Sequence, residues 1–206
     1  MPTLCGQARF RVGMLTMSCP TSIDPKYISD LHLFDASSLG WRPLFSDVYS
    51  YADFIIDNWN RFTNPDEIVF IVGDIGHYCQ KTIEVLQRLN GHKLLILGNH
   101  DTSWGNTVFS CGCFVGVYKA FDLESIHIQH IPEPITTSYT WYVHGHHHRY
   151  DMPGMYKALQ LYAADTYRLN CSADINNHRP CNIQELLLNK EVMLDAMRTK
   201  GILQEE

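Results

Sequence analysis

The sequence predicts a protein of the α/β class, an αββα sandwich in which two mixed β-sheets are flanked by helices. Three observations lead to this prediction. Apolar runs alternate with amphipathic segments in the first half, strand-like segments crowd the second half, and helical periodicity returns near the C-terminus. At 206 residues the chain can form one domain with a full core. We expect this domain to span residues 25–206, after an N-terminal extension, residues 1–24, of unknown role.

The first half of the chain alternates predicted strands and helices. Its apolar runs are too short for core helices and are typical of buried strands. Between them, apolar residues recur near the helical period. A strand–helix–strand order implies a parallel sheet with right-handed crossovers. The predicted strands span residues 26–29, 68–72 and 93–97, and the predicted helices span residues 47–61 and 81–89.

The second half is predicted to be mostly strand. After residue 110 the helical periodicity fades, and Gly, Pro, Asp and Asn separate short apolar segments. Five strands are predicted there, over residues 114–121, 126–130, 141–144, 158–163 and 167–173. Two predicted helices then end the chain, over residues 183–188 and 191–200.

Composition and charge narrow the classes of function. The formal net charge of −6 argues against broad nucleic-acid binding, which a basic surface usually drives. Seven cysteines, an odd number without dense disulfide spacing, favour a reducing cytoplasm. No apolar run approaches the length of about 20 residues that spans a bilayer, so we expect no membrane partner. Cys111-Gly112-Cys113 could bind metal or be redox-active, or it could occupy a turn.

Five short polar segments carry most of the functional information. Each follows an apolar or aromatic run, so each is predicted to lie where a strand ends. Ligand sites of open α/β sheets lie at that edge. Carboxylate, amide and imidazole donors together suit a pair of divalent ions rather than a structural zinc, which would favour cysteines. The segments are Asp30-Leu31-His32, Gly73-Asp74, Gly98-Asn99-His100-Asp101, His130 and Gly145-His146-His147-His148.

In this order, the five segments resemble the motifs of the calcineurin-like metallophosphoesterases, and the chain looks most like the small bacterial and phage-type members. The resemblance runs from about residue 27 to residue 180. It includes Arg42-Pro43, Asn58-Trp59-Asn60 and Pro65-Asp66. One feature departs from the family: small relatives often continue the first motif with Gly-His, whereas here His32 is followed by Leu33-Phe34-Asp35. That loop usually borders the substrate.

The resemblance implies two divalent metal ions, with manganese favoured over iron, nickel or zinc. Three ligands would hold the first ion, three the second, and one would bridge both: Asp30, His32 and His148; Asn99, His130 and His146; and Asp74. A hydroxide between the ions would attack phosphorus in line. By strand alternation, His144 and His147 should point away from the ligands and support or pack against them.

The resemblance also implies the catalytic and substrate-binding residues. His100 would protonate the leaving oxygen, and Asp101 would orient its ring. Arg42 could contact a substrate phosphate, or it could be a solvated loop residue that supports the turn formed by residues 41–43. His77 could line the substrate pocket, or it could merely begin a loop.

These residues predict a metal-dependent phosphoesterase acting on a phosphorylated small molecule. A phosphodiester of nucleotide type is the favoured substrate, because the chain has no room for a large cap domain. A serine/threonine protein phosphatase or another phosphomonoesterase is the alternative. A nuclease is disfavoured by the net charge. An inactive binding scaffold with the same fold is an alternative of a different class, and a complete ligand set argues against it.

Overall fold

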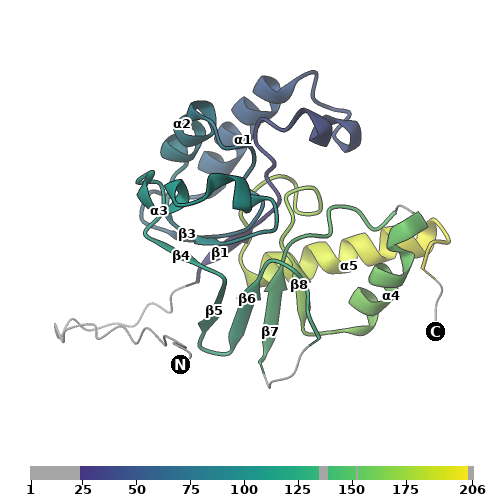
Figure 1. The fold of residues 1–206 in the computed structure, drawn as a ribbon. Coiled ribbons are helices and arrows are strands. Elements are labelled where there is room, and N and C mark those ends of the chain that lie inside the picture. The colour runs from purple at the N-terminus through teal and green to yellow at the C-terminus, as the bar shows by residue number, and fades with distance from the viewer. Residues whose placement is uncertain (1–23, 135–138, 152, 204–206) are drawn as a thin grey trace, which may run out of the picture.

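The computed structural model describes residues 24–134, 139–151 and 153–203, so residues 1–23 of the predicted extension lie outside it. Two four-stranded sheets are flanked by helices (Figure 1). This arrangement agrees with the predicted α/β class. Among the described residues, no helix combines the length and the apolar character that crossing a bilayer requires.

The first sheet is parallel throughout. Its strands, in spatial order, are β1 (Lys26–Ile28), β2 (Ile68–Val72), β3 (His92–Ile96) and β4 (Gly116–Tyr118). The prediction that both sheets are mixed is therefore wrong for this one. Each of its strands is joined to the next by a helical crossover, and crossovers of this kind return the chain in the same direction.

Two helices cover the outer face of the first sheet, namely α1 (Val48–Phe62) and α2 (Gln80–Arg88). Helix α1 begins at Asp47, whose carboxylate accepts hydrogen bonds from the backbone N–H groups of Tyr49 and Ser50. The third crossover contains the short helices η2 (Asp101–Trp104) and α3 (Thr107–Ser110). A further short helix, η1 (Ala36–Trp41), lies between β1 and α1.

The second sheet is mixed, as predicted. Its strands are β5 (Ala120–Leu123), β6 (Ile126–Gln129), β7 (Trp141–His144) and β8 (Arg168–Asn170), and only β5 and β6 pair antiparallel. The single strand predicted over residues 114–121 is divided between the sheets: β4 ends the first and β5 begins the second. Exposed Lys119 is the only residue between them.

Helices flank the second sheet beside β8, where η3 (Pro153–Met155), α4 (Tyr156–Ala164) and α5 (Ile183–Thr199) lie (Figure 1). The prediction of a strand over residues 158–163 is wrong. Leu159 and Tyr162, three residues apart, are buried against α5, whereas Leu161 is exposed. That spacing fits one face of a helix rather than a strand. The two predicted C-terminal helices are one continuous helix, because Asn189 and Lys190 do not interrupt it.

Strand alternation divides the core into two layers. Val69 and Ile71 point toward α1 and α2, whereas Phe70 and Val72 point toward the second sheet. There they meet an inner face that includes Val143. This apolar layer holds the sheets face to face. As a result, the carboxyl ends of β1, β2 and β3 lie next to those of β6 and β7, which is where the polar motifs begin.

Candidate metal centre

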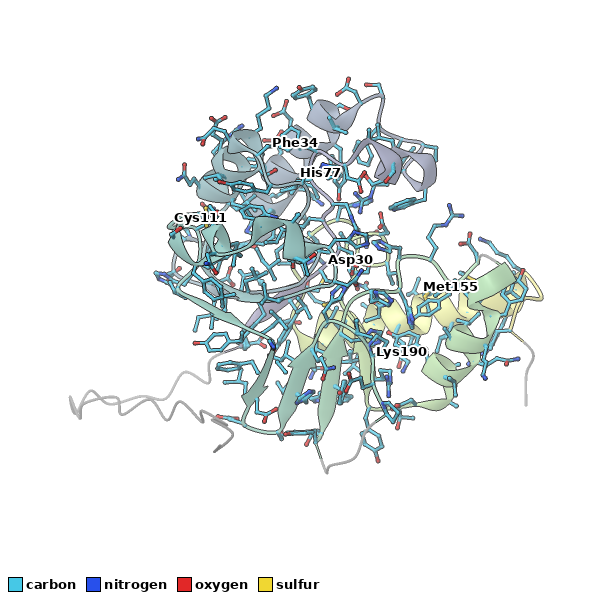
Figure 2. All side chains as sticks on the ribbon, viewed as in Figure 1. Asp30, Phe34, His77, Cys111, Met155 and Lys190 are labelled. Atoms are coloured by element: carbon cyan, nitrogen blue, oxygen red, sulfur yellow. The ribbon has the colours of Figure 1, made fainter. Side chains whose placement is uncertain are left out.

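The predicted ligands meet where the two sheets come together. Asp30 follows β1, Asp74 follows β2 and Asn99 follows β3, while His130 follows β6 directly. The segment after β7 contributes His146 and His148 to the same place. Figure 2 shows Asp30 near the middle of the molecule.

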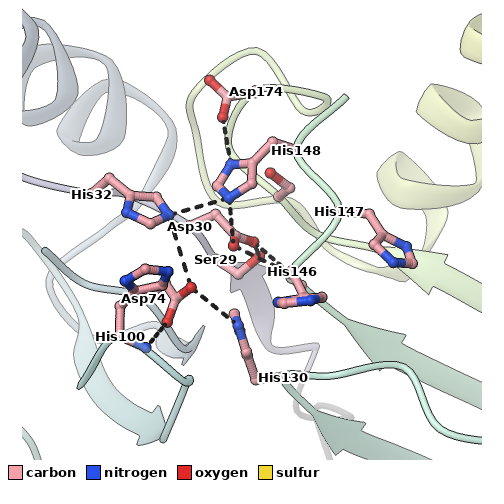
Figure 3. A network of polar contacts seen from close by, with 12 residues as sticks. Ser29, Asp30, His32, Asp74, His100, His130, His146, His147, His148 and Asp174 are labelled. Carbon is pink, nitrogen blue, oxygen red and sulfur yellow. Dashed lines mark hydrogen bonds and ion pairs between the residues drawn. The ribbon is translucent and has the colours of Figure 1, made fainter. Parts of the chain in front are cut away.

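Two groups of three donors form there. In the first, ligand atoms of Asp30, His32 and His148 lie within 4.8 Å of one another, and in the second, ligand atoms of Asp74, His130 and His146 do so. The groups adjoin, because Oδ2 of Asp74 is 3.2 Å from Nε2 of His130 and 3.8 Å from Nε2 of His32 (Figure 3). Asp74 thus lies between them, as a bridging ligand would.

Asn99 completes the second group. Its side-chain oxygen lies 3.0 Å from Nε2 of His130 and 3.0 Å from Nδ1 of His146. All seven predicted ligands are therefore brought together by the fold. His144 and His147 belong to neither group. His144 is fully buried and its Nδ1 lies 2.7 Å from the carbonyl oxygen of Gly145, while the ring of His147 points away from the cluster (Figure 3).

The geometry of the first group fits a cation. Nε2 of His32 and Nε2 of His148 face each other at 3.2 Å, while Nδ1 of His148 faces the carboxylate of Asp174 at 3.0 Å. With its proton on the side of Asp174, His148 presents a lone pair inward. Asp30 and Asp74 are 0% and 1% exposed. Buried carboxylates and inward imidazole lone pairs suit borderline divalent ions.

Charge within the second group supports the same interpretation. Burial would raise the pKa of Asp74, but its hydrogen bonds from His130 and from the backbone of His100 outweigh burial and lower it to about 2. Burial would lower the pKa of His130, but the carboxylate of Asp74 raises it to about 9. In the metal-free protein, a proton on His130 neutralises Asp74. Binding a cation would release that proton, since an imidazole must be neutral to coordinate.

The backbone is strained at the ligands themselves. Asp30, His32, Asp74 and His146 have φ angles of 59°, 45°, 55° and 71°, which is the sparsely populated left-handed region. Residues held there typically mark functional sites, and each costs on the order of 1–3 kcal/mol. Two of these residues, Asp30 and His32, are two positions apart in the sequence and contribute donors to the same group.

Close approach of the backbone demands a glycine beside the ligands. A Cβ atom on Gly145 would lie 2.5 Å from Oγ of Ser29 and 2.7 Å from Oδ2 of Asp30. The absent side chain lets the backbone N–H of His146 donate to that carboxylate at 2.9 Å. The motif glycine is therefore required sterically.

Arg42 is buried, which corrects both alternatives for this residue: it is neither a substrate contact nor a solvated loop residue. Its guanidinium is buried and forms a bidentate pair with Asp174, at 2.7 and 3.0 Å. It also donates to the backbone carbonyls of Asp30 and Leu31, at 2.8 and 2.9 Å. These hydrogen bonds hold the backbone of the first motif, Asp30-Leu31-His32, in place.

The predicted role of Asp101 is also wrong. Its carboxylate turns inward and accepts hydrogen bonds from the backbone N–H groups of Asp74, Ile75 and Gly98, at 2.8–2.9 Å. Asp101 therefore ties the second motif to the third, and its carboxylate hydrogen-bonds to these backbone amides rather than to the ring of His100. Only the family resemblance had implied that role.

His100 and His77 both line a cavity of 320 Å³ beside His32, which also includes Asp35, Tyr78 and Ser103. The ring of His100 stands edge-on to that of His32, with centroids 5.3 Å apart. Its backbone N–H donates to Oδ1 of Asp74 at 2.9 Å. His77 is therefore a cavity residue rather than merely the start of a loop, and its side chain is 67% exposed.

Sequence reasoning missed Asp174, Ser29 and Trp41. Asp174 binds both His148 and Arg42, Ser29 donates to Oδ2 of Asp30 at 2.5 Å, and Trp41 packs against His148, with ring centroids 5.5 Å apart. A signal existed for Asp174 alone: it is an acidic residue shortly after an apolar strand, as Asp30 and Asp74 are.

No family model matches this chain. The chain is similar to an uncharacterized protein of Methanocaldococcus jannaschii, MJ1445, with 27% identity over 166 residues, which cover 76% of this chain and 85% of that protein. Among solved structures, it is similar to a protein of unknown function from Aquifex aeolicus, AQ665. The TM-score is 0.59 and the identity 20%, over 79% of this chain and 97% of that one. The second likeness shows a shared fold.

Proposed function

We propose that this protein is a dinuclear metal-dependent phosphoesterase that hydrolyses phosphodiesters, with nucleotide-type substrates favoured. The observation that carries the proposal is the joining of two three-donor groups through Asp74, beside a cavity that contains His100. One ion would be held by Asp30, His32 and His148, the other by Asn99, His130 and His146, and both by Asp74. Manganese is the favoured metal, while iron, nickel and zinc suit the same donors.

Two divalent ions bound there would supply Lewis acidity and lower the pKa of water toward neutrality. Asp30 and Asp74 return only part of the positive charge, so the loaded site attracts a phosphoryl anion. In the reaction, water adds to phosphorus and the bond to the leaving oxygen breaks. His100 gives a proton to that oxygen, and the products are an alcohol and a phosphomonoester.

A protein phosphatase is the second candidate of the enzyme class, and a binding scaffold is the candidate outside it. Cavities on both sides of the centre favour a phosphorus with two organic substituents over a monoester. The complete donor set favours an enzyme over a scaffold. We also propose a reducing, cytoplasmic location, in which the five described cysteines, all free thiols, would stay reduced.

The test is a substrate panel on protein stripped of metal and reloaded with manganese. We expect kcat/KM to be highest for bis-para-nitrophenyl phosphate, lower for para-nitrophenyl phosphate and lowest for a phosphoserine peptide. Asp74→Asn should abolish turnover, because the bridging carboxylate loses its charge.

Two results would redirect the proposal. A preference for the phosphopeptide would indicate a protein phosphatase. Absence of turnover on every substrate, in protein that elemental analysis shows to hold manganese, would indicate a scaffold.

A further inference from the structure

A second cavity lies on the other side of the candidate metal centre. It has a volume of 250 Å³ and is lined by Trp41, His146, His148, Arg149 and Met155. None of these residues lines the cavity that contains His100. Two of them, His146 and His148, are among the proposed ligands, so this cavity adjoins the candidate metal centre.

An indole, two imidazoles and a thioether form most of the walls of the second cavity. The indole of Trp41 is half-buried and packs against His148 and His32, with centroids 5.5 and 6.1 Å apart. Opposite, η3 supplies the thioether of Met155. The guanidinium of Arg149 is already paired in a bidentate manner with Asp151, at 2.9 and 2.8 Å. A flat, neutral aromatic group suits these walls, whereas a second anion does not.

The position of His100 sets the orientation of a bound diester. His100 lines only the first cavity, so the leaving oxygen, which takes its proton, must face that side. There Asp35, His77 and Ser103 provide polar groups that suit a hydroxyl-bearing alcohol. The substituent that stays on phosphorus is directed toward Trp41 and Met155.

We propose that the cavity between Trp41 and Met155 binds the nucleobase of the ester that remains attached to phosphorus. The substrate class is then a nucleoside phosphodiester whose other ester is to a polar alcohol. This inference rests on the proposed function. It adds that the cavity of Trp41 and Met155 binds the base, and that the alcohol leaves on the side of His100.

Two diesters with the same leaving group test the inference. One is the para-nitrophenyl ester of thymidine monophosphate and the other is methyl para-nitrophenyl phosphate. Both release nitrophenol, so the bond that breaks is the same and only the retained group differs. We expect kcat/KM to be at least tenfold higher for the thymidine ester, since stacking of a base is worth about that factor or more.

Variants of Trp41 and Met155 test whether this cavity causes the preference for the thymidine ester. Met155→Ala and Trp41→Leu should each lower the ratio of the two kcat/KM values by about fivefold or more. Leu44→Ala is the matched control, because Leu44 lies in the loop after Trp41, is 90% exposed and does not line the cavity. Elemental analysis of each variant shows whether its metal content is kept, which matters for Trp41 because it packs against two ligands.

A binding measurement provides a second readout. Calorimetry on the manganese-loaded protein should show tighter binding of thymidine monophosphate than of methyl phosphate, and Met155→Ala should reduce that difference. Equal kcat/KM for both diesters, with a ratio that no variant changes, would overturn the inference and leave the phosphoesterase intact. Turnover of neither diester by metal-loaded protein would overturn the proposed function, and the inference with it.

Discussion

His100 stands at the rim of the candidate metal centre, where it touches the ligands without joining either donor group. Its backbone N–H is held by Asp74, and its ring lines the cavity. The side chain is therefore placed by the ligand that joins the two groups, yet it remains free to meet a substrate. This is the placement that a proton donor to a leaving group needs.

The loss of activity in His100→Ala should depend on whether the leaving group of the substrate needs a proton. We expect kcat to fall by about 10²–10⁴ for diesters with alkyl leaving groups. The loss should be far smaller for nitrophenyl esters, because nitrophenolate departs without protonation. His92→Ala serves as the control, since His92 is an exposed histidine at the start of β3. Similar losses on both kinds of ester would argue against the acid role.

At the residue scale, the sequence predicted the residues of the two donor groups well and the residues that support them poorly. Each ligand segment follows a strand, so topology alone brings Asp30, Asp74 and His130 to one edge. The direction of a neighbouring side chain depends on local φ angles, which the sequence does not show. Asp101 therefore turned out to bind backbone amides, and Arg42 turned out to be buried. Their partners are distant in sequence, so no spacing rule reveals them.

At the element scale, the pair between Arg42 and Asp174 fastens η1 to the segment after β8. The carboxylate of Asp174 also holds His148, so one ion pair positions elements from both sheets. Burial opposes the charge on Asp174, but the hydrogen bonds from His148 and Arg42 outweigh it and lower the pKa of this carboxyl group. The link is therefore charged at neutral pH.

Arg42→Met tests this link. Removing one partner of a buried pair typically costs about 3–5 kcal/mol of unfolding free energy, because the other charge is left buried. Arg88→Met is the matched control: Arg88 pairs with Asp53 at 3.9 Å on the surface, so we expect a change within about 0.5 kcal/mol. Urea denaturation measures both.

The pH dependence of the same variant has a definite sign. A carboxyl group with a lowered folded-state pKa stabilises the fold above its ordinary pKa of about 4, and this contribution is lost as pH falls through the lower folded-state value. The difference in stability between wild type and Arg42→Met should therefore shrink below about pH 4. A difference that stays constant down to pH 2 would contradict the role of Asp174.

The sequence predicted helices and strands correctly where the spacing of their buried residues follows a single period. Residues 68–72 form β2, as expected for a short, continuous apolar run, which is typical of a strand buried on both faces. Helix α4 was mistaken for a strand because Leu, Tyr and Ala residues crowd its sequence and obscure the spacing of Leu159 and Tyr162. The division of β4 from β5 depends on which sheet each segment joins, a long-range choice that local pattern does not contain.

At the scale of the whole molecule, each donor group draws on both sheets. Asp30 and His32 come from the first sheet and His148 from the second, while Asp74 and His130 divide in the same way. A bound ion would therefore connect the sheets as well as serve chemistry. In the metal-free protein, the two buried carboxylates rely on histidine protons and backbone amides instead.

Chelation should consequently lower the melting temperature, and manganese should restore it. A ligand that binds only the folded state at a hundred times its Kd stabilises it by about 2.7 kcal/mol. Differential scanning calorimetry, with metal content checked by elemental analysis, measures the shift. Asp74→Asn should show a smaller response to added manganese. An unchanged melting curve after verified removal of metal would contradict the coupling.

Tyr27 in β1 exchanges two backbone hydrogen bonds with Cys181, at 2.8 and 3.0 Å, and Ser29 is held in a similar manner by the segment after β8. During synthesis on the ribosome, the outer edge of β1 therefore stays unpaired until the segment around Cys181 has emerged. Until then that edge offers unpaired amides to other nascent chains. Truncations that end before residue 181 should accordingly be recovered as aggregates rather than as shorter folded proteins.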